Sequence, residues 1–379
     1  MRELPLSRRP SLGGMNRVLI TSDTVGGIWQ YTIELAAGLK RLGVEPIIAA
    51  LGAPSPPGFL SIGNCSVFFF PCRLEWMQDP WEDVKRSGDW LLRLADHLKP
   101  DLVHINGYAH AARNFPVPVL VVGHSCVYSW YQAVRGRPPS ARWEHYRQAV
   151  ADGLKAARGV TAPTAAMLSS LAHHYGTFRR LEPIANGRRS ASFPPAAKET
   201  LIFSAGRLWD EAKNIATLTQ VAGGLAWPVV VAGEQTHPDG GKVHFRNVRL
   251  LGVLTQQQIA AWFARAAIYA LPALYEPFGL TALEAGLAGC ALVLGDIPSM
   301  RETWEGAALF VPPRRNDLLE AALNRLIDDE RLRRSFARKA RQKALAFTTE
   351  KMVRRYAKLY GQLLGEEEKE IIPWQPKIA

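Results

Sequence analysis

The sequence predicts an α/β protein of two domains, each built on a doubly wound parallel sheet, that face each other across a cleft. Three observations lead to this prediction. The chain has 379 residues, more than one hydrophobic core usually serves. Short apolar runs alternate with helical patterns along the chain, an order that gives parallel sheets covered on both faces. A segment rich in Pro, Ser and Arg, residues 188–200, interrupts the series near its middle and is expected to link the domains.

Both halves show the same alternation of expected strands and helices. In the first half, Ile33, Ala36, Ala37 and Lys40 recur at helical spacing before Gly43, a residue that favours a helix end. Further helices are expected over residues 164–174 and 214–223. The expected strands are residues 17–21, 46–51, 101–106, 117–122 and 160–163 in the first half, and residues 201–205, 229–232, 248–251, 268–271 and 291–294 in the second.

These elements divide the chain into four parts. We expect a first domain over residues 16–190, a second domain over residues 198–347, and a crossover helix and tail over residues 348–379. Residues 1–15 contain arginines but no apolar h-region, so they are expected to be a disordered extension upstream of a second start at Met15, not a secretory signal. In the final helix, a single apolar stripe predicts packing back on the first domain. The stripe is formed by Met352, Tyr356, Leu359, Tyr360 and Leu363.

Composition is typical of a soluble cytoplasmic enzyme. Hydrophobic residues make up 47% of the chain and charged residues 21%, and no apolar run of about 18 residues predicts a membrane-spanning helix. The cysteines lack metal-ligand spacing and are expected to be reduced thiols. They are Cys65, Cys72, Cys126 and Cys290.

The formal net charge of +12 calls for an anionic partner. Nucleotide-sugars, anionic lipid surfaces and nucleic acid are the candidates. A dense basic block from Arg331 to Lys343 follows three acids, residues 328–330. This order suits a solvated helix with acids at its start and bases at its end. The alternative is a surface that brings the protein into peripheral contact with the inner face of an anionic membrane.

The segment Glu276-Pro-Phe-Gly-Leu-Thr-Ala-Leu-Glu284 contains the main candidate binding and catalytic residues. It follows an expected strand, begins as a loop, and is expected to continue as a helix over residues 280–287. Free N–H groups at a helix start suit a diphosphate. Glu284 is placed to accept hydrogen bonds from a ribose diol and Glu276 to reach the transferred sugar; spacing alone leaves two solvated glutamates equally open. The expected donor-binding residues at the loop and helix start are Phe278, Gly279, Leu280 and Thr281.

At this point the sequence resembles a known family. Glu276 and Glu284, with seven residues between them, are similar to the donor-binding signature of retaining glycosyltransferases of family 4, which have the GT-B fold. The likeness extends from about residue 16 to residue 364, and it implies that residues 16–190 form the acceptor-side domain and residues 198–347 the nucleotide-sugar-binding domain. Further segments also resemble motifs of this family. They are Gly26-Gly27, Asn186-Gly187, Ser204-Ala-Gly-Arg207-Leu, Lys213-Asn214, Val229-Val-Val-Ala-Gly233-Glu234 and Leu251-Gly-Val-Leu-Thr255.

The resemblance implies that Arg207 and Lys213 bind the donor diphosphate. Two fixed cations stabilise the charge of a departing nucleoside diphosphate without a metal, so no metal and no other cofactor is expected. The alternative is a surface Arg and Lys at a strand–helix junction. Gly26 and Gly27 end the first strand, where a missing Cβ lets the backbone approach a phosphate or sugar; a simple turn is the alternative.

His124 ends another strand, in Gly123-His-Ser125. The resemblance implies that His124 faces the donor sugar, where it hydrogen-bonds a hydroxyl or helps to stabilise the transition state, so His124 and Glu276 are the expected catalytic residues. A structural histidine is the alternative. The aromatic and basic stretch over residues 128–143 shapes an acceptor pocket or forms a surface loop, and the sequence leaves both open.

The predicted function is therefore transfer of a hexosyl or pentosyl group from a nucleoside-diphosphate sugar to a hydroxyl. The acceptor is a glycan, a lipid-linked molecule or a small molecule, and retention of configuration is implied by the family. A nucleotide-sugar epimerase or a phosphorylase on the same fold is the enzymatic alternative. A basic nucleic-acid-binding protein is disfavoured because the charge is dispersed along the chain, and no nucleic-acid partner is expected.

Overall fold

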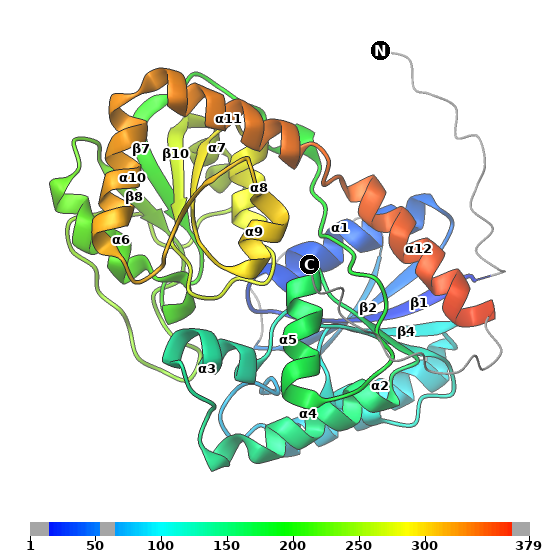
Figure 1. Ribbon diagram of the computed structural model, residues 1–379. Helices are drawn as coiled ribbons and strands as arrows, with labels where there is room; N and C mark the ends of the chain where they lie inside the picture. The colour runs from blue at the N-terminus through cyan, green and yellow to red at the C-terminus, as the bar shows by residue number, and fades with distance from the viewer. Residues whose placement is uncertain (1–14, 54–64, 366–379) are drawn as a thin grey trace, which may run out of the picture.

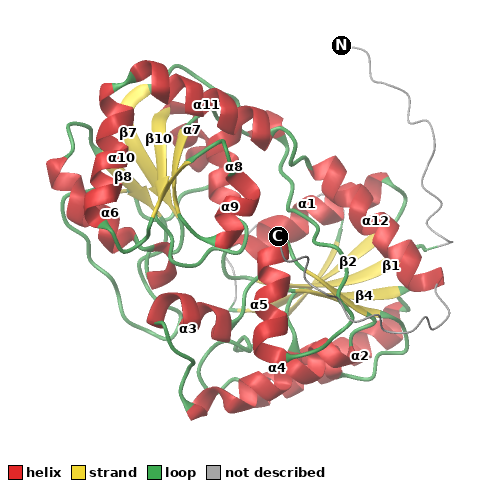
Figure 2. Ribbon diagram, viewed as in Figure 1, coloured by secondary structure: helices red, strands yellow, loops and turns green. Residues whose placement is uncertain are grey.

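A computed structural model describes residues 15–53 and 65–365 of the chain. Two α/β bodies lie one above the other in Figures 1 and 2, each with a central sheet between helices. The expectation of disorder before Met15 and the expected tail after residue 365 fall outside the described residues.

The first sheet has six parallel strands in the order β3-β2-β1-β4-β5-β6. Its central strands are buried along nearly their whole length, as parallel strands covered on both faces must be. The bounds are β1 (Arg17–Asp23), β2 (Glu45–Gly52), β3 (Ser66–Pro71), β4 (Leu102–Ile105), β5 (Val119–Val122) and β6 (Gly159–Thr161).

The second sheet repeats this plan in the order β12-β11-β10-β7-β8-β9, again with parallel pairing. Its central strand β10 is buried at every residue. The bounds are β7 (Glu199–Ala205), β8 (Val229–Ala232), β9 (Arg249–Leu250), β10 (Ala266–Leu271), β11 (Ala291–Gly295) and β12 (Leu309–Val311). The prediction of two doubly wound parallel sheets is confirmed.

Helices cover both faces of each sheet. In the first body, α2, α4 and α5 pack on one face, and α1 packs on the other together with α12. In the second body, α7 and α8 pack on one face of the sheet, and α6 and α10 pack on the other. The bounds are α1 (Gly27–Arg41), α2 (Trp81–Leu98), α3 (Val127–Arg135), α4 (Glu144–Ala156), α5 (Ala165–Tyr175), α6 (Ile215–Val221), α7 (Gln256–Arg265), α8 (Leu280–Leu287), α9 (Pro298–Trp304), α10 (Asn316–Asp328), α11 (Glu330–Ala344) and α12 (Thr349–Gly365).

The last helix, α12, crosses back to the first body, as the apolar stripe predicts, and Figure 1 shows it beside α1. The stripe residues are buried against β1 and α1 in one apolar cluster. Gly38 of α1 allows this close packing, since a Cβ atom there would lie only 2.2 Å from Cγ2 of Val353.

Strand order determines where the site lies. In the first sheet the order reverses between β1 and β4, and in the second between β7 and β10. Ligands of open parallel sheets bind beyond the carboxyl ends of the strands at such a reversal. The loops that begin at Thr24, Asn106, Gly206 and Pro272 follow these four strands, so they meet between the two bodies.

Two edge strands, β3 and β12, were not predicted. Both are flanking strands with partly exposed residues, so they lack the continuous buried pattern of the central strands. β3 ends in Pro71, a residue that sheets accept at their edges. The run Val67-Phe-Phe-Phe70 was the available signal.

The basic block lies on α11, which begins at Glu330 with Asp329 as its N-cap. Three of its bases bond the carbonyl ends of neighbouring helices, an arrangement that helix dipoles favour. Arg333 donates to Leu326 O and Ile327 O, Arg341 to Leu287 O, and Lys343 to Glu305 O. Part of the positive charge therefore stabilises the fold.

Candidate active site

A cavity of about 330 Å³ lies between the two bodies, beyond the carboxyl ends of β1, β7 and β10. It is lined by residues from α1 and the β5–α3 loop of the first body and by residues from the loops after β7 and β10 of the second. Ten of the eleven predicted site residues line it. They are Gly26, Gly27, His124, Arg207, Lys213, Glu276, Phe278, Gly279, Leu280 and Thr281.

The start of α1 and the start of α8 approach each other across this cavity. A Cβ atom on Gly27 would lie 3.1 Å from Cδ1 of Leu280, and one on Gly26 would lie 3.3 Å from Nη1 of Arg207. Gly26 also has a φ of 84°, which a side chain would strain. The backbone at Gly26 therefore favours glycine, and a side chain at Gly27 would require the Leu280 side chain to shift by a few tenths of an ångström.

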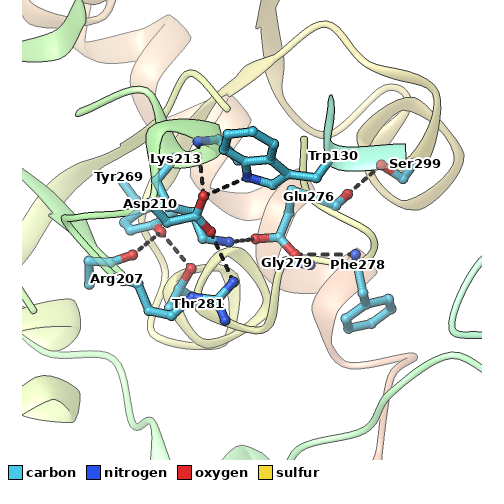
Figure 3. Close-up of polar contacts among 12 residues, drawn as sticks. Trp130, Arg207, Asp210, Lys213, Tyr269, Glu276, Phe278, Gly279, Thr281 and Ser299 are labelled. Carbon is cyan, nitrogen blue, oxygen red and sulfur yellow. Dashed lines mark hydrogen bonds and ion pairs between the residues drawn. The ribbon is translucent and has the colours of Figure 1, made fainter. Parts of the chain in front are cut away.

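Two cations and two carboxylates form the polar wall of the second body (Figure 3). Arg207 Nη2 donates to Asp210 Oδ2 at 2.9 Å, and Lys213 Nζ lies 2.5 Å from Glu276 Oε2. Burial alone would raise the pKa of Asp210, but the charges of Arg207 and Lys213 lower it below its usual range, helped by a hydrogen bond from Trp130. Asp210 is thus ionised and holds Arg207 in place.

Glu276 is held at the start of α8. Its Oε1 accepts hydrogen bonds from the N–H groups of Phe278 and Gly279, at 3.3 and 2.9 Å. Burial acts to raise the pKa of Glu276, but the charge of Lys213 and these hydrogen bonds outweigh burial and lower it. Glu276 is therefore a carboxylate at neutral pH. Glu276 occupies these two amides just before the helix, and Leu280 and Thr281, the first residues of α8, also line the cavity.

His124 faces the cavity from the first body, and its partners fix its tautomer. Its Nε2 lies 2.8 Å from Asn106 Oδ1, and His104 Nε2 lies 3.0 Å from the same oxygen. Asn106 Nδ2 donates to Thr21 O at 2.7 Å, so the Asn106 oxygen must be the atom that accepts. Both histidines therefore hold their proton on Nε2, and the Tyr360 hydroxyl donates to Nδ1 of His104 at 2.7 Å.

Burial lowers the pKa of His124 to about 3, and nearby His104 adds to the effect. His124 is therefore neutral at physiological pH, with a lone pair on Nδ1. In this state the ring can accept a hydrogen bond from a sugar hydroxyl without adding positive charge.

Glu284 is the one predicted residue that lines neither this cavity nor the larger one beside it. Its side chain is 8% exposed, and Oε1 lies 2.7 Å from Nη2 of Arg188. Burial raises the pKa of Glu284 although Arg188 opposes the shift. The contact of Glu284 with a ribose stays a prediction.

The larger cavity, of about 390 Å³, adjoins the first and shares His124, Trp130 and Arg207 with it. Five residues of the stretch 128–143 line it, namely Trp130, Tyr131, Arg135, Arg142 and Trp143. That this stretch shapes an acceptor pocket stays a prediction. Rings from both bodies enclose the cavity, since Trp76 stacks on Trp209 with centroids 6.4 Å apart.

Two acids lie in the wall of this larger cavity. Asp23 Oδ1 is enclosed and has no hydrogen-bond partner among the described residues; burial raises its pKa to about 7 against the opposing charge of Arg207. Glu75 accepts from the N–H groups of Tyr108 and Ala109, and burial raises its pKa to about 6. Within residues 15–53 and 65–365, no three His, Cys, Asp or Glu side chains are grouped as metal ligands would be.

Two family models match the chain in succession. Residues 25–189 match the model Glycosyltransferase Family 4, and residues 188–343 match Glycosyl transferases group 1. The chain belongs to glycosyltransferase family 4. The first match contains Gly26, Gly27 and His124, and the second contains Arg207, Lys213 and the Glu276–Glu284 segment.

Curated relatives of this family 4 glycosyltransferase match it over parts of its length. N,N'-diacetylbacillosaminyl-diphospho-undecaprenol alpha-1,3-N-acetylgalactosaminyltransferase of Campylobacter jejuni is 29% identical over 141 residues, 36% of this chain and 37% of that protein. Glycogen synthase of Mycobacterium tuberculosis is 35% identical over 123 residues, 30% of each chain. The matched stretches thus span about a third of these relatives.

Solved structures show that this glycosyltransferase has the GT-B fold. Sucrose-phosphate synthase from Thermosynechococcus elongatus superposes with a TM-score of 0.76 at 18% identity, over 92% of this chain and 99% of that one. Anabaena HepE in complex with UDP-glucose gives a TM-score of 0.74 at 16% identity, over 90% and 98% of the two chains. The similarity therefore extends over both bodies and their arrangement.

Sequence reasoning on this glycosyltransferase missed two residues that hold the bodies together at the site. Asp210 Oδ1 accepts from Trp130 Nε1 of the first body at 2.9 Å, as Figure 3 shows, and also from the N–H of Ala212. The only local signal was an Asp two residues before that amide, the usual position for such a turn. For Trp130, no local pattern indicated its partner.

No helix in the described part of the chain is both long and apolar enough to cross a membrane.

Proposed function

We propose that this family 4 enzyme moves a hexosyl group from a nucleoside-diphosphate sugar to an acceptor hydroxyl and retains the anomeric configuration. One observation supports the proposal above all: Arg207, Lys213 and Glu276 share one cavity wall, opposite His124 and the Gly26-Gly27 loop. A nucleotide-sugar needs cations for its diphosphate and a hydrogen-bond acceptor for its sugar hydroxyls, and this wall supplies both.

On the donor side, we assign the diphosphate to Arg207, Lys213 and the helix-start amides of Leu280 and Thr281. Lys213 Nζ lies 2.5 Å from Glu276 Oε2, so the cation assigned to the phosphate also orients the carboxylate assigned to the sugar. We assign the ribose to Glu284, whose Oε1 also binds Arg188. Glu284 lines neither cavity, so this assignment requires the ribose to reach past the cavity wall. The donor then rests mainly on the domain of residues 198–347.

On the acceptor side, we assign the larger cavity, which opens on the domain of residues 16–190. Its aromatic walls suit the apolar faces of sugar rings. The Campylobacter relative is named for a lipid-diphosphate-linked glycan acceptor, and the cavity has room for the terminal sugar of such a molecule as well as for a free sugar.

For the chemistry, we propose attack on the face from which the nucleoside diphosphate leaves. The acceptor oxygen forms the new bond to the anomeric carbon, the bond to the leaving phosphate breaks, and the hydroxyl proton passes to a phosphate oxygen. Arg207 and Lys213 stabilise the leaving charge. Glu276 is bound to Lys213 and to two amides, so it is fixed as a hydrogen-bonding group and not as a carboxylate nucleophile.

For location, we propose the cytoplasm, with peripheral contact at the inner face of an anionic membrane. The exposed bases of α11, Arg331, Arg338 and Lys339, support this proposal. Co-sedimentation with phosphatidylglycerol vesicles, absent with phosphatidylcholine vesicles, is the expected result. Equal partitioning to both would contradict it.

A panel of UDP-, GDP- and ADP-sugars tests the main proposal. At least one donor should raise the melting temperature, because a ligand that binds only the folded state stabilises it. NMR of the product formed with a glycan acceptor should show the donor's own anomeric configuration. Inversion, or the absence of any donor response, would overturn the proposal.

A further inference from the structure

A buried cluster of charges lies where the two domains join, outside both cavities. Arg188 is at its centre with a side chain only 2% exposed. Its Nη2 lies 2.7 Å from Glu284 Oε1, and its Nη1 lies 3.3 Å from Glu34 Oε1. One guanidinium therefore binds two carboxylates, and each carboxylate is almost as buried as the arginine.

The cluster draws on four separate segments of the chain. Glu34 lies on α1 of the first domain, and Glu284 lies on α8 of the second. Arg188 lies in the chain segment that leaves the first domain, and Thr349 begins the helix that returns to it. Thr349 Oγ1 donates to Glu34 Oε2 at 2.9 Å. The two crossing segments are also joined through the backbone, since the N–H of Arg188 donates to Phe347 O.

The two helices that Arg188 joins are the ones whose first residues form the donor cavity. α1 begins at Gly27 and α8 begins at Leu280, and these two residues face each other in close contact. Glu34 lies two turns along α1, and Glu284 lies about one turn along α8. A rigid link at these points sets the distance and angle between the two helix starts.

Arginine suits this link better than lysine. A guanidinium is planar, always charged and able to donate in two directions at once, whereas an ammonium is a point charge on a flexible stem. Here the two terminal nitrogens each take one carboxylate, and the ring of Phe193 lies 5.1 Å from the guanidinium carbon. The link thus uses both terminal nitrogens of the guanidinium, which point in different directions and which lysine lacks.

We propose that Arg188 is a positioning residue for sugar transfer: through Glu34 and Glu284 it holds α1 and α8 in the register that aligns the donor with the acceptor-side loop. This inference rests on the proposed function. Glu284 is held in a fixed orientation before a donor arrives, and the acceptor domain is tied through Glu34 to the same guanidinium. Loosening the link therefore misplaces the acceptor relative to the anomeric carbon.

The main test uses Glu34→Gln, because Glu34 lines neither cavity and cannot touch either substrate. Gln keeps the size of Glu and an oxygen for Thr349, so the fold is preserved, while the ionic link to Arg188 is lost. Glu45→Gln is the matched control, since Glu45 makes a surface ion pair with Arg17 in which both side chains are about half exposed. Arg188→Lys is the second variant. It keeps the positive charge but replaces the two terminal guanidinium nitrogens with a single ammonium.

Assays use the nucleotide-sugar that the wild type binds, at a temperature well below the melting point of every variant. Glu34→Gln and Arg188→Lys should each lower kcat by about ten- to a hundredfold, since misplacement of reacting groups by about 1 Å has an effect of that order. The double variant should lose little more than the worse single variant, because both changes break one link. Glu45→Gln should stay within about twofold of wild type.

Lowered melting points with unchanged kcat in both variants would show a purely structural cluster and overturn the inference. If the wild type transfers no sugar, the proposed function fails, and X-ray scattering in solution then decides the inference alone. Both variants should show a larger radius of gyration than wild type and Glu45→Gln; superimposable curves would refute the link.

Discussion

Nε2 of His124 lies 2.8 Å from Oδ1 of Asn106, and this contact determines which ring nitrogen of His124 carries the proton. Asn106 is itself held by Thr21, whose backbone oxygen accepts from Nδ2 and whose hydroxyl accepts from the N–H of Asn106. The lone pair of the neutral His124 ring is therefore on Nδ1. Tyr360 of α12 is joined to Asn106 through His104, so hydrogen bonds connect the crossover helix to His124.

We expect Asn106→Leu to lower kcat by about ten- to a hundredfold, because the Nε2–H of His124 loses its acceptor and the ring is free to turn or to change tautomer. Nitrogen NMR of labelled histidine should show a mixture of tautomers where the wild type shows one. Asn316→Leu is the control, since Asn316 is exposed and bonds only Gln220 in the described residues. A single unchanged tautomer in Asn106→Leu would contradict the assignment.

Glu276→Gln should separate sugar recognition from nucleotide binding. The amide keeps an oxygen for the N–H groups of Phe278 and Gly279, but it loses the charge that pairs with Lys213. We expect kcat to fall by about a hundredfold or more, while calorimetry shows unchanged or tighter binding of the free nucleoside diphosphate, because Lys213 is released. Weaker binding of the diphosphate would assign Glu276 to the nucleotide instead.

Arg207→Ala should reduce turnover by about a hundred- to a thousandfold, the usual result of removing one group that stabilises a developing charge. Arg265→Ala is the matched control, since Arg265 pairs with Glu199 on the surface with both side chains about half exposed. We expect that control to leave kcat unchanged. Wild-type turnover by Arg207→Ala would remove this residue from the site.

Asp23→Asn should stabilise the protein at high pH. Burial raises the pKa of Asp23 to about 7, above the ordinary value of 3.8 that applies to an unfolded chain, so folding favours the protonated acid. The cost of ionising Asp23 in the fold therefore grows between about pH 4 and pH 7 and is complete above pH 7. We expect the variant to melt several degrees higher than wild type at pH 8, roughly 2–4 °C for each kcal/mol regained.

At pH 4 the two proteins should melt at nearly the same temperature, because Asp23 is then protonated in the fold. Scanning calorimetry across this range checks the difference curve. Equal melting points at pH 8 would show that the Asp23 carboxyl ionises at its ordinary pKa in the folded state.

Chelator treatment should leave transfer intact, because Arg207 and Lys213 are placed to neutralise the leaving diphosphate. The initial rate with the identified donor is measured before and after incubation with EDTA, followed by gel filtration. A loss of rate that magnesium or manganese restores would contradict the metal-free mechanism.

The sequence by itself determined the elements and the loops that form the site. The helix predicted over residues 280–287 is α8 (Leu280–Leu287), and the strand predicted over residues 229–232 is β8 (Val229–Ala232). Central parallel strands are buried on both faces, so their apolar runs are continuous and easily recognised. Glycines and polar residues at strand ends then indicated the loops, and parallel order brings those loops to one edge.

Only the tertiary structure decided which partner each side chain has. Asn106 holds His124, Asp210 connects Arg207 to Trp130, and Arg188 binds Glu284. These contacts join segments that lie far apart in the sequence, so no local pattern reveals them. A buried charge must be paired, but the pairing depends on which elements the fold brings together. The sequence thus indicated residues that line one cavity between the domains, and the joining of the domains decided how these residues are held.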